Sequence, residues 1–283
     1  MLAKKIAEPR SCEYAQGRVC APHPPSGDRV TWAEHLAVLG AGLVAGILTS
    51  TVGVASLVSF PVLVAVGLPP VVANVSNTLG LIPGGLSGSF GYREELRTHP
   101  RVSWTVVLSC ALGAIGGAAL LLTQPAETFE AVVPWLILFS CLLVGAQPLI
   151  SKWLRRHEDQ DRPPAGRVTM SPTTTFFALL TGTYGGYFGA GSGVMMVAVL
   201  GLGTEIDLRV VNGLKTVAVL AGNLVAGAIF VVVAEVDWVS VLTLAAGSVV
   251  GGYVGARVGR RLPPGLFRVL VVAAGIVAAI ALL

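Results

Sequence analysis

Charged residues are scarce in this sequence of 283 residues: they make up 12% of it, whereas hydrophobic types make up 54%. A water-soluble domain normally has about 25% charged residues, because its surface must stay hydrated. The mean hydropathy is +0.77, and the polar residues collect between apolar runs long enough for the ~20 residues that cross a bilayer core. The composition therefore excludes an ordinary soluble domain and predicts an integral membrane protein.

Two further patterns are missing. The apolar runs lack the alternation of apolar and polar residues that marks a transmembrane strand, so we expect an all-α protein rather than a barrel. The first 35 residues lack the early apolar region of a signal peptide. We expect residues 1–35 to form a polar N-terminal tail.

Cysteine is rare as well. Cys12 and Cys20 lie in the polar tail, whereas Cys110 and Cys141 lie in apolar runs. The chain has no C-x-x-C pair and no Cys/His cluster, so it predicts no metal site and no cofactor, and we interpret the cysteines as structural or incidental. A net charge of +4 in a membrane protein reflects basic cytoplasmic loops and does not indicate nucleic-acid binding.

What the chain does contain is a series of apolar segments in two groups. The first membrane part covers 36–151 and the second 173–283, with a charged linker at 152–172 between them. Glycines beside polar residues predict a break near Gly53 and another between Gly189 and Gly193. The predicted segments are 36–66, 70–90, 102–123, 131–151, 173–200, 210–233, 238–257 and 265–283.

The two parts form an internal repeat. A shift of 138 positions places Gly53 on Gly191, and it aligns two further pairs, Asn74 with Asn212 and Thr78 with Thr216. Each half then contains a broken segment, an N-x-x-x-T helix, a glycine-rich helix and a final apolar helix.

Loop charges predict that the halves have inverted topology. The loop at 91–101 contains three arginines, whereas its counterpart at 234–237 is acidic and has no basic residue. The turn at 124–130 is acidic, whereas its counterpart at 257–263 is basic. Because basic loops favour the cytoplasm, equivalent loops should lie on opposite sides of the membrane, and the basic linker should be cytoplasmic.

This topology requires an odd number of crossings between the linker and the 234–237 loop, so the broken 173–200 segment is expected to enter and return. By symmetry the 36–66 segment should behave alike, although it is long enough for a full span plus a half-helix. The basic tail residues Lys4, Lys5 and Arg10 favour the extra span, because they would then lie inside. Both alternatives remain open.

Polar side chains within apolar runs indicate where substrate could bind, because they are costly in hydrocarbon unless paired or facing a cavity. Asn and Thr groups occur at matching positions of both halves, and the second cluster also contains Lys215 and Asn223. We interpret both clusters as helix starts, which attract anions, with Lys215 as the main attraction. The predicted substrate-binding residues are Lys215, Asn212, Thr216, Asn74, Asn77, Thr78, Gly53 and Gly191.

Each of these residues has a simpler interpretation. Lys215 could extend to the membrane interface, and Asn74 and Asn212 could cap or pack helices. The matching positions in the two halves favour function. Carboxylates occur only at helix ends and in loops, so no carboxylate-based proton relay or sodium site is visible.

Three stretches carry a resemblance to a known family. They are GLVAGILTSTVGVASLVSFPVLVAVGLPPVVANVSNTLGLIPGGLSGSFGYREEL at 42–96, VVNGLKTVAVLAGNLVAGAIF at 210–230 and WVSVLTLAAGSVVGGYVGARVGRRLPPGLFR at 238–268. In this order they resemble the sulfite exporter TauE/SafE family of membrane anion transporters, and the resemblance covers 36–283. It implies two repeated halves and transport of small sulfur-containing anions or organosulfonates.

The leading expectation is thus a multi-pass plasma-membrane protein, not an enzyme, that moves a small anion as a secondary transporter or facilitator. Its expected partners are that anion and the lipid bilayer, with no nucleic acid. One alternative is an intramembrane serine hydrolase, because Gly85-Leu86-Ser87-Gly88 matches a G-x-S-G motif, although no histidine lies inside a span to serve as its base. The other is a membrane scaffold without transport, for which costly polar groups in the membrane have no use.

Overall fold

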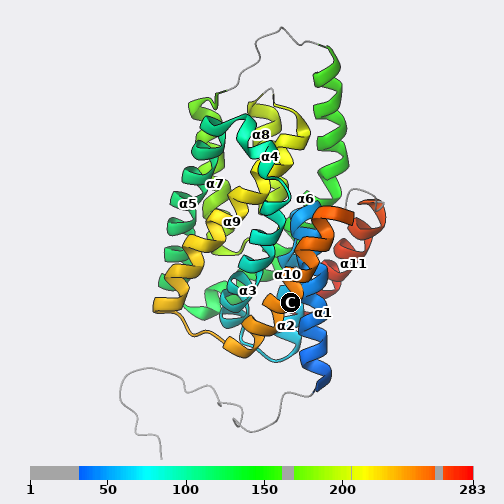
Figure 1. The fold of residues 1–283 in the computed structure, drawn as a ribbon. Coiled ribbons are helices and arrows are strands. Elements are labelled where there is room, and N and C mark those ends of the chain that lie inside the picture. The colour runs from blue at the N-terminus through cyan, green and yellow to red at the C-terminus, as the bar shows by residue number, and fades with distance from the viewer. Residues whose placement is uncertain (1–31, 161–168, 205, 259–263, 283) are drawn as a thin grey trace, which may run out of the picture. The chain divides into compact units, whose positions relative to one another are not determined.

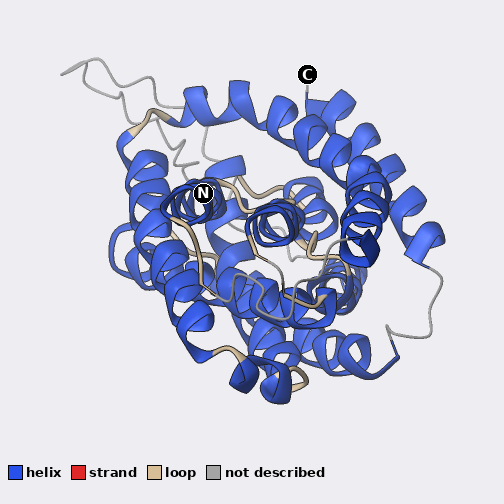
Figure 2. Cartoon of the chain, turned by 90° about the horizontal axis from the view of Figure 1, so that it is seen from above, coloured by secondary structure: helices blue, strands red, loops and turns tan. Residues whose placement is uncertain are grey.

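A computed structural model describes residues 32–160, 169–204, 206–258 and 264–282, and in these ranges the regular structure is entirely helical (Figures 1 and 2). The predicted all-α class is confirmed. In chain order the helices are α1 (Trp32–Thr51), α2 (Ser56–Ala65), α3 (Pro70–Phe90), α4 (Arg93–Thr98), α5 (Pro100–Thr123), α6 (Ala126–Gln160), α7 (Pro172–Tyr187), α8 (Ser192–Gly203), α9 (Leu208–Val233), α10 (Trp238–Val258) and α11 (Pro264–Leu282).

The apolar character of these helices makes the chain a multi-pass membrane protein. Five helices of the described ranges are long and apolar enough to cross a bilayer: α1, α5, α9, α10 and the 126–149 stretch of α6. Large apolar side chains cover their outer faces, with Leu142 69% and Val232 83% exposed. Such surfaces are stable against lipid tails but not against water.

Two helix boundaries extend beyond the predicted segments. Helix α1 begins at Trp32, within the stretch predicted as tail, and α6 continues to Gln160, within the predicted linker. The extension of α6 has a local cause, since Lys, Leu, Arg and Glu dominate its last turns and are strong helix formers.

Both predicted breaks are present. Residues 52–55 separate α1 from α2, and residues 188–191 separate α7 from α8. Gly53, Gly189 and Gly191 have φ values of +84°, +81° and +78°. Only glycine adopts this left-handed region without strain, so the glycines let the chain leave one helix and begin another within four residues.

After the second break the chain returns to the side from which it entered. The end of α8 meets the beginning of α7, because a Cβ on Gly203 would lie 2.8 Å from the Cβ of Thr174. The predicted re-entrant segment at 173–200 is therefore a helical hairpin. In the first half, α2 packs against α1, and α1, about 30 Å long, is itself long enough to cross the membrane.

Helices of the two halves exchange partners in a regular way. Helix α1 packs on α10 as α7 packs on α5, and α3 packs on α10 as α9 packs on α5. Gly182 allows the close approach of α7 to α5, since a Cβ there would lie 2.6 Å from the Cys110 carbonyl oxygen. This exchange is what a two-fold relation between the halves requires.

Helices α3 and α9 lie side by side and run in opposite directions. Gly85 faces Leu220, whereas Gly227, further along α9, faces the earlier residue Leu79. The connection after α3 and the connection after α9 therefore leave from opposite ends of this pair (Figure 1). It stays a prediction that the two-fold axis lies in the membrane plane. The side of the membrane on which each end of this helix pair lies also stays a prediction.

Candidate functional site

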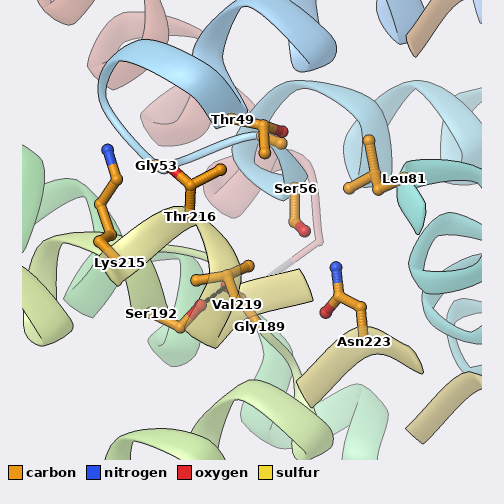
Figure 3. Close-up of a pocket in the computed structure, with 11 residues that line it drawn as sticks. Thr49, Gly53, Ser56, Leu81, Gly189, Ser192, Lys215, Thr216, Val219 and Asn223 are labelled. Atoms are coloured by element: carbon orange, nitrogen blue, oxygen red, sulfur yellow. Dashed lines mark hydrogen bonds between the residues drawn. The ribbon is translucent and has the colours of Figure 1, made fainter. Parts of the chain in front are cut away.

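The two breaks meet inside the protein. A Cβ on Gly53 would lie 3.0 Å from the Cα of Gly193. Next to this contact is a small cavity of about 20 Å³ (Figure 3). Both predicted breaks therefore contribute to the lining of this cavity, through Gly53 and Gly189. The cavity is lined by Thr49, Gly53, Ala55, Ser56, Leu81, Gly189, Ser192, Lys215, Thr216, Val219 and Asn223.

Two helices begin at this cavity, one from each half. Their first residues, Ser56 of α2 and Ser192 of α8, both line it. Neither helix has a side chain that caps its N-terminus. Most N–H groups of the first turns donate to carbonyl oxygens of the preceding break, as Val58 does to Ala55 and Val194 to Gly191, but the positive end of each helix dipole still lies at the cavity. Two helix N-termini at one cavity create a positive potential that favours an anion.

Lys215 adds a full charge to this region. Its side chain is 1% exposed, and its Nζ donates to the carbonyl oxygen of Thr51 at 3.2 Å and to Oδ1 of Asn212 at 3.4 Å. The side chain therefore does not extend to the membrane interface. The structure gives it no ion pair with a described carboxylate, and an ammonium has three N–H donors. A buried cation without a counter-ion is costly, and a bound anion would offset that cost.

The polar clusters do not open their helices, contrary to the prediction. Lys215 lies about two turns inside α9, and Asn77 lies about two turns inside α3. Both helices start earlier for local reasons. Proline occupies the first position of α3, where its missing N–H costs nothing, and the Asp207 side chain accepts a hydrogen bond from the Arg209 N–H at the start of α9. The helix starts that lie at the cavity are those of α2 and α8.

In the first half, the predicted site residues connect helices. Asn74 donates through Nδ2 to the carbonyl oxygen of Tyr187 at 2.9 Å, while its buried Oδ1 has no partner. Asn77 donates to Ser56 Oγ at 3.0 Å and accepts a hydrogen bond from Ser59. Thr78 donates to the carbonyl oxygen of Asn74 within α3. These three residues do not line the cavity; Asn74 and Asn77 hold the two breaks in place.

In the second half, Lys215 and Thr216 line the cavity and Asn212 supports Lys215. The Thr216 hydroxyl donates to the Asn212 carbonyl oxygen at 2.9 Å, so its proton is already engaged. Gly53 lines the cavity but Gly191 does not: Gly189 takes that place, and Gly191 lies against Ser140. The alignment by 138 positions is therefore offset at the breaks.

Several residues that line the cavity are not among the predicted substrate-binding residues. Ser56 and Ser192 are the first residues after the two breaks, and this shared position is a signal that sequence alone could have supplied. Asn223 was recognised as polar but not assigned to the site. It follows Lys215 and Val219 at intervals of four, a spacing that places all three on one face of a helix.

Ser87, the residue of the hydrolase alternative, has structural contacts. Its hydroxyl donates to the carbonyl oxygens of Gly84 at 3.0 Å and Val249 at 3.2 Å, which lie on α3 and α10. Within the described ranges, no histidine forms a hydrogen bond with it. Ser87 thus connects two packed helices.

Comparisons with known proteins agree with one another. A match to the family described as Sulfite exporter TauE/SafE covers residues 38–282. A "Probable membrane transporter protein" of Haemophilus influenzae is 26% identical over 223 residues, which are 76% of this chain and 81% of the relative. A "Probable membrane transporter protein ORF9" of Sinorhizobium sp is 26% identical over 245 residues, which are 86% of this chain and 90% of the relative. No solved structure matches the chain.

Proposed function

The chain belongs to the sulfite exporter TauE/SafE family and is a membrane transporter, and we propose that it moves a small anion across the plasma membrane. The proposed substrate class is a sulfur oxyanion or an organosulfonate, such as sulfite. The printed description of the family supports sulfite, while the cavity supports an anion in general.

One observation carries this proposal. The N-termini of α2 and α8 and the buried Lys215 meet at a cavity whose lining contains no carboxylate. Each of these groups favours negative charge. Because helix ends act in a region of low dielectric, their attraction for an anion is much stronger there than in water.

The cavity is too small in this structure to hold the proposed substrate. A volume of about 20 Å³ is enough for roughly one water molecule, whereas sulfite has four heavy atoms. Binding and release therefore require the two broken segments to separate where Gly53 touches Gly193. Movement of one broken repeat against the other is a common way for transporters to expose a central site alternately to the two sides.

The membrane potential supplies a driving force for export. Outward movement of one negative charge from a negative-inside cell is favoured by about 2.3 kcal/mol per 100 mV. Export therefore requires no coupling ion. Inward movement of the anion, by contrast, requires a substrate gradient or a second ion.

Flux measurements on purified protein in liposomes test the proposal. We expect a potential that is positive on the destination side to speed the movement of sulfite or a related anion, with sulfate, thiosulfate and sulfonates compared in parallel. Protein-free liposomes and liposomes with a heat-inactivated sample are the controls. If none of these anions moves faster than through the controls, the transport proposal fails and a scaffold role is favoured.

A further inference from the structure

A second cavity of about 10 Å³ adjoins the first. Ser192, Val219 and Asn223 line both cavities and therefore form the junction between them. The second cavity extends away from Lys215, between α5, α7, α8 and α9, and Cys110 and Met196 line its far part. Small residues, with Thr181 and Ser192, thus line a second cavity beside the first, and its surface is mostly apolar.

Asn223 is placed to contact an anion at this junction. Its side chain is half-buried, and no hydrogen bond joins it to another described residue. Figure 3 shows Asn223 and Lys215 at opposite ends of the lined space, with Thr216 and Val219 between them on α9. A neutral amide offers two N–H donors, which suit the oxygens of an oxyanion or sulfonate without holding it as strongly as a second cation would.

In the described part of the other half, a larger side chain fills the corresponding place. Gly42 meets Leu244 as Gly182 meets Cys110, so Leu244 occupies the place of Cys110. Leu244 is fully buried and fills the space against Gly80, where a Cβ would lie 2.7 Å from Leu244 Cδ2. The residue that matches Asn223 under the shift of 138 is Gly85, which has no side chain. The two halves therefore differ at both positions.

We propose that the anion moves past Asn223, from the cavity beside Lys215 into the space beside Cys110, and that Asn223 binds the anion's oxygens on the way. This path runs towards α5 and α7 and therefore does not follow the two-fold relation between the halves. This inference rests on the proposed transport function and adds to it a substrate-binding residue and a route.

Substitutions at Asn223 test the first part. Asn223→Asp keeps the size of the side chain but repels anions, and Asn223→Leu keeps the bulk but removes both donors. We expect each to lower anion flux about tenfold or more, which is the usual effect of losing a hydrogen bond to a charged group. Asn223→Gln keeps the amide and should retain more flux than either. Thermal unfolding of each variant shows whether the loss arises from folding.

The native Cys110 tests the route. The other cysteines are first replaced by Cys12→Ser, Cys20→Ser and Cys141→Ser. While the protein transports anion, it is then treated with an anionic or a cationic methanethiosulfonate reagent of similar size, and the rate of Cys110 modification is measured. We expect the anionic reagent to modify Cys110 faster, relative to a free thiol in solution, and to block flux. Lys215→Met should remove this preference. A control variant moves the thiol to the corresponding position of the other half, through Cys110→Ala with Leu244→Cys. This thiol should remain unmodified.

The outcomes separate the two proposals. If the parent protein moves no anion, the transport function fails. If the parent moves anions but Asn223→Asp and Asn223→Leu do so at the parental rate, the role of Asn223 is overturned while transport stands. Modification of Leu244→Cys as fast as Cys110, or equal rates of Cys110 with both reagents, would overturn the one-sided route.

Discussion

The ammonium of Lys215 lies 3.2 Å from the carbonyl oxygen of Thr51, the last residue of α1. A helix C-terminus carries partial negative charge, so this contact stabilises the end of the first broken helix. The same side chain lines the cavity where α2 and α8 begin. Lys215 therefore contacts a helix end of the opposite half and supplies positive charge to the candidate site.

The two roles of Lys215, as a contact of the α1 end and as a buried charge, have opposite effects on the free energy of unfolding. Lys215→Met removes two hydrogen bonds, but it also removes a buried charge that has no described counter-ion, and these effects oppose each other. We expect the free energy of unfolding to change by no more than about 1 kcal/mol, measured by thermal unfolding in detergent. A loss of several kcal/mol would show that the lysine acts chiefly as a cap of α1.

Gly53 should tolerate no side chain. Its φ of +84° strains any other residue, and a Cβ there would lie 3.0 Å from Gly193 Cα. We expect Gly53→Ala to cost about 1–3 kcal/mol and to reduce flux, because the two breaks are forced apart. Gly40→Ala is the matched control: nothing lies within 4 Å of its added Cβ, so stability should be unchanged or slightly higher. Equal stability of both variants would contradict the tight contact.

Asn77 and Asn74 should differ in their contribution to stability. Asn77→Leu removes the hydrogen bonds to Ser56 and from Ser59, although Ser59 keeps its bond to the Ala55 carbonyl oxygen, and should cost about 1–3 kcal/mol. Asn74→Leu removes one hydrogen bond, to Tyr187, but also a buried oxygen without a partner, so its cost should be smaller. The midpoints of thermal unfolding give the order. The reverse order would mean that the Asn77 contacts are weak.

Inverted topology predicts the accessibility of two loops. With the native cysteines replaced, Arg93→Cys and Val236→Cys should react with a membrane-impermeant thiol reagent from opposite sides of oriented vesicles. The antiparallel arrangement of α3 and α9 places their C-terminal connections at opposite ends, which supports this expectation. Reaction of both cysteines from the same side would contradict the inverted repeat.

The helical segments were predictable from sequence because membrane helices are specified by long apolar runs, and the breaks because glycine alone tolerates the backbone at Gly53 and Gly189. The predicted segments begin at 70 and 210, close to the observed helix starts at Pro70 and Leu208. The interpretation of the polar clusters as helix starts is wrong, because Asn77 and Lys215 lie about two turns further along these helices.

The site was predicted in part. Lys215 was recognisable because a lysine in an apolar run is rare, and Thr216 and Gly53 lie beside it as expected. Asn74 and Asn77 are likewise polar residues within an apolar run, but they form hydrogen bonds with Tyr187 and Ser56 and do not line the cavity. Which polar side chain faces a cavity and which one bonds to a neighbouring helix depends on helix rotation and on contacts between distant segments, which one sequence does not specify.

The most direct test of the account is potential-driven anion flux through liposomes that contain the parent protein, Lys215→Met, Lys215→Arg or Lys152→Met. Lys152 is an exposed residue of α6, so its substitution controls for the loss of one positive charge. We predict that flux falls at least about tenfold in Lys215→Met, in line with the loss of a charge-assisted contact, remains measurable in Lys215→Arg and is unchanged in Lys152→Met. Parental flux in a well-folded Lys215→Met protein would show that the anion does not depend on Lys215 and would contradict the assigned site.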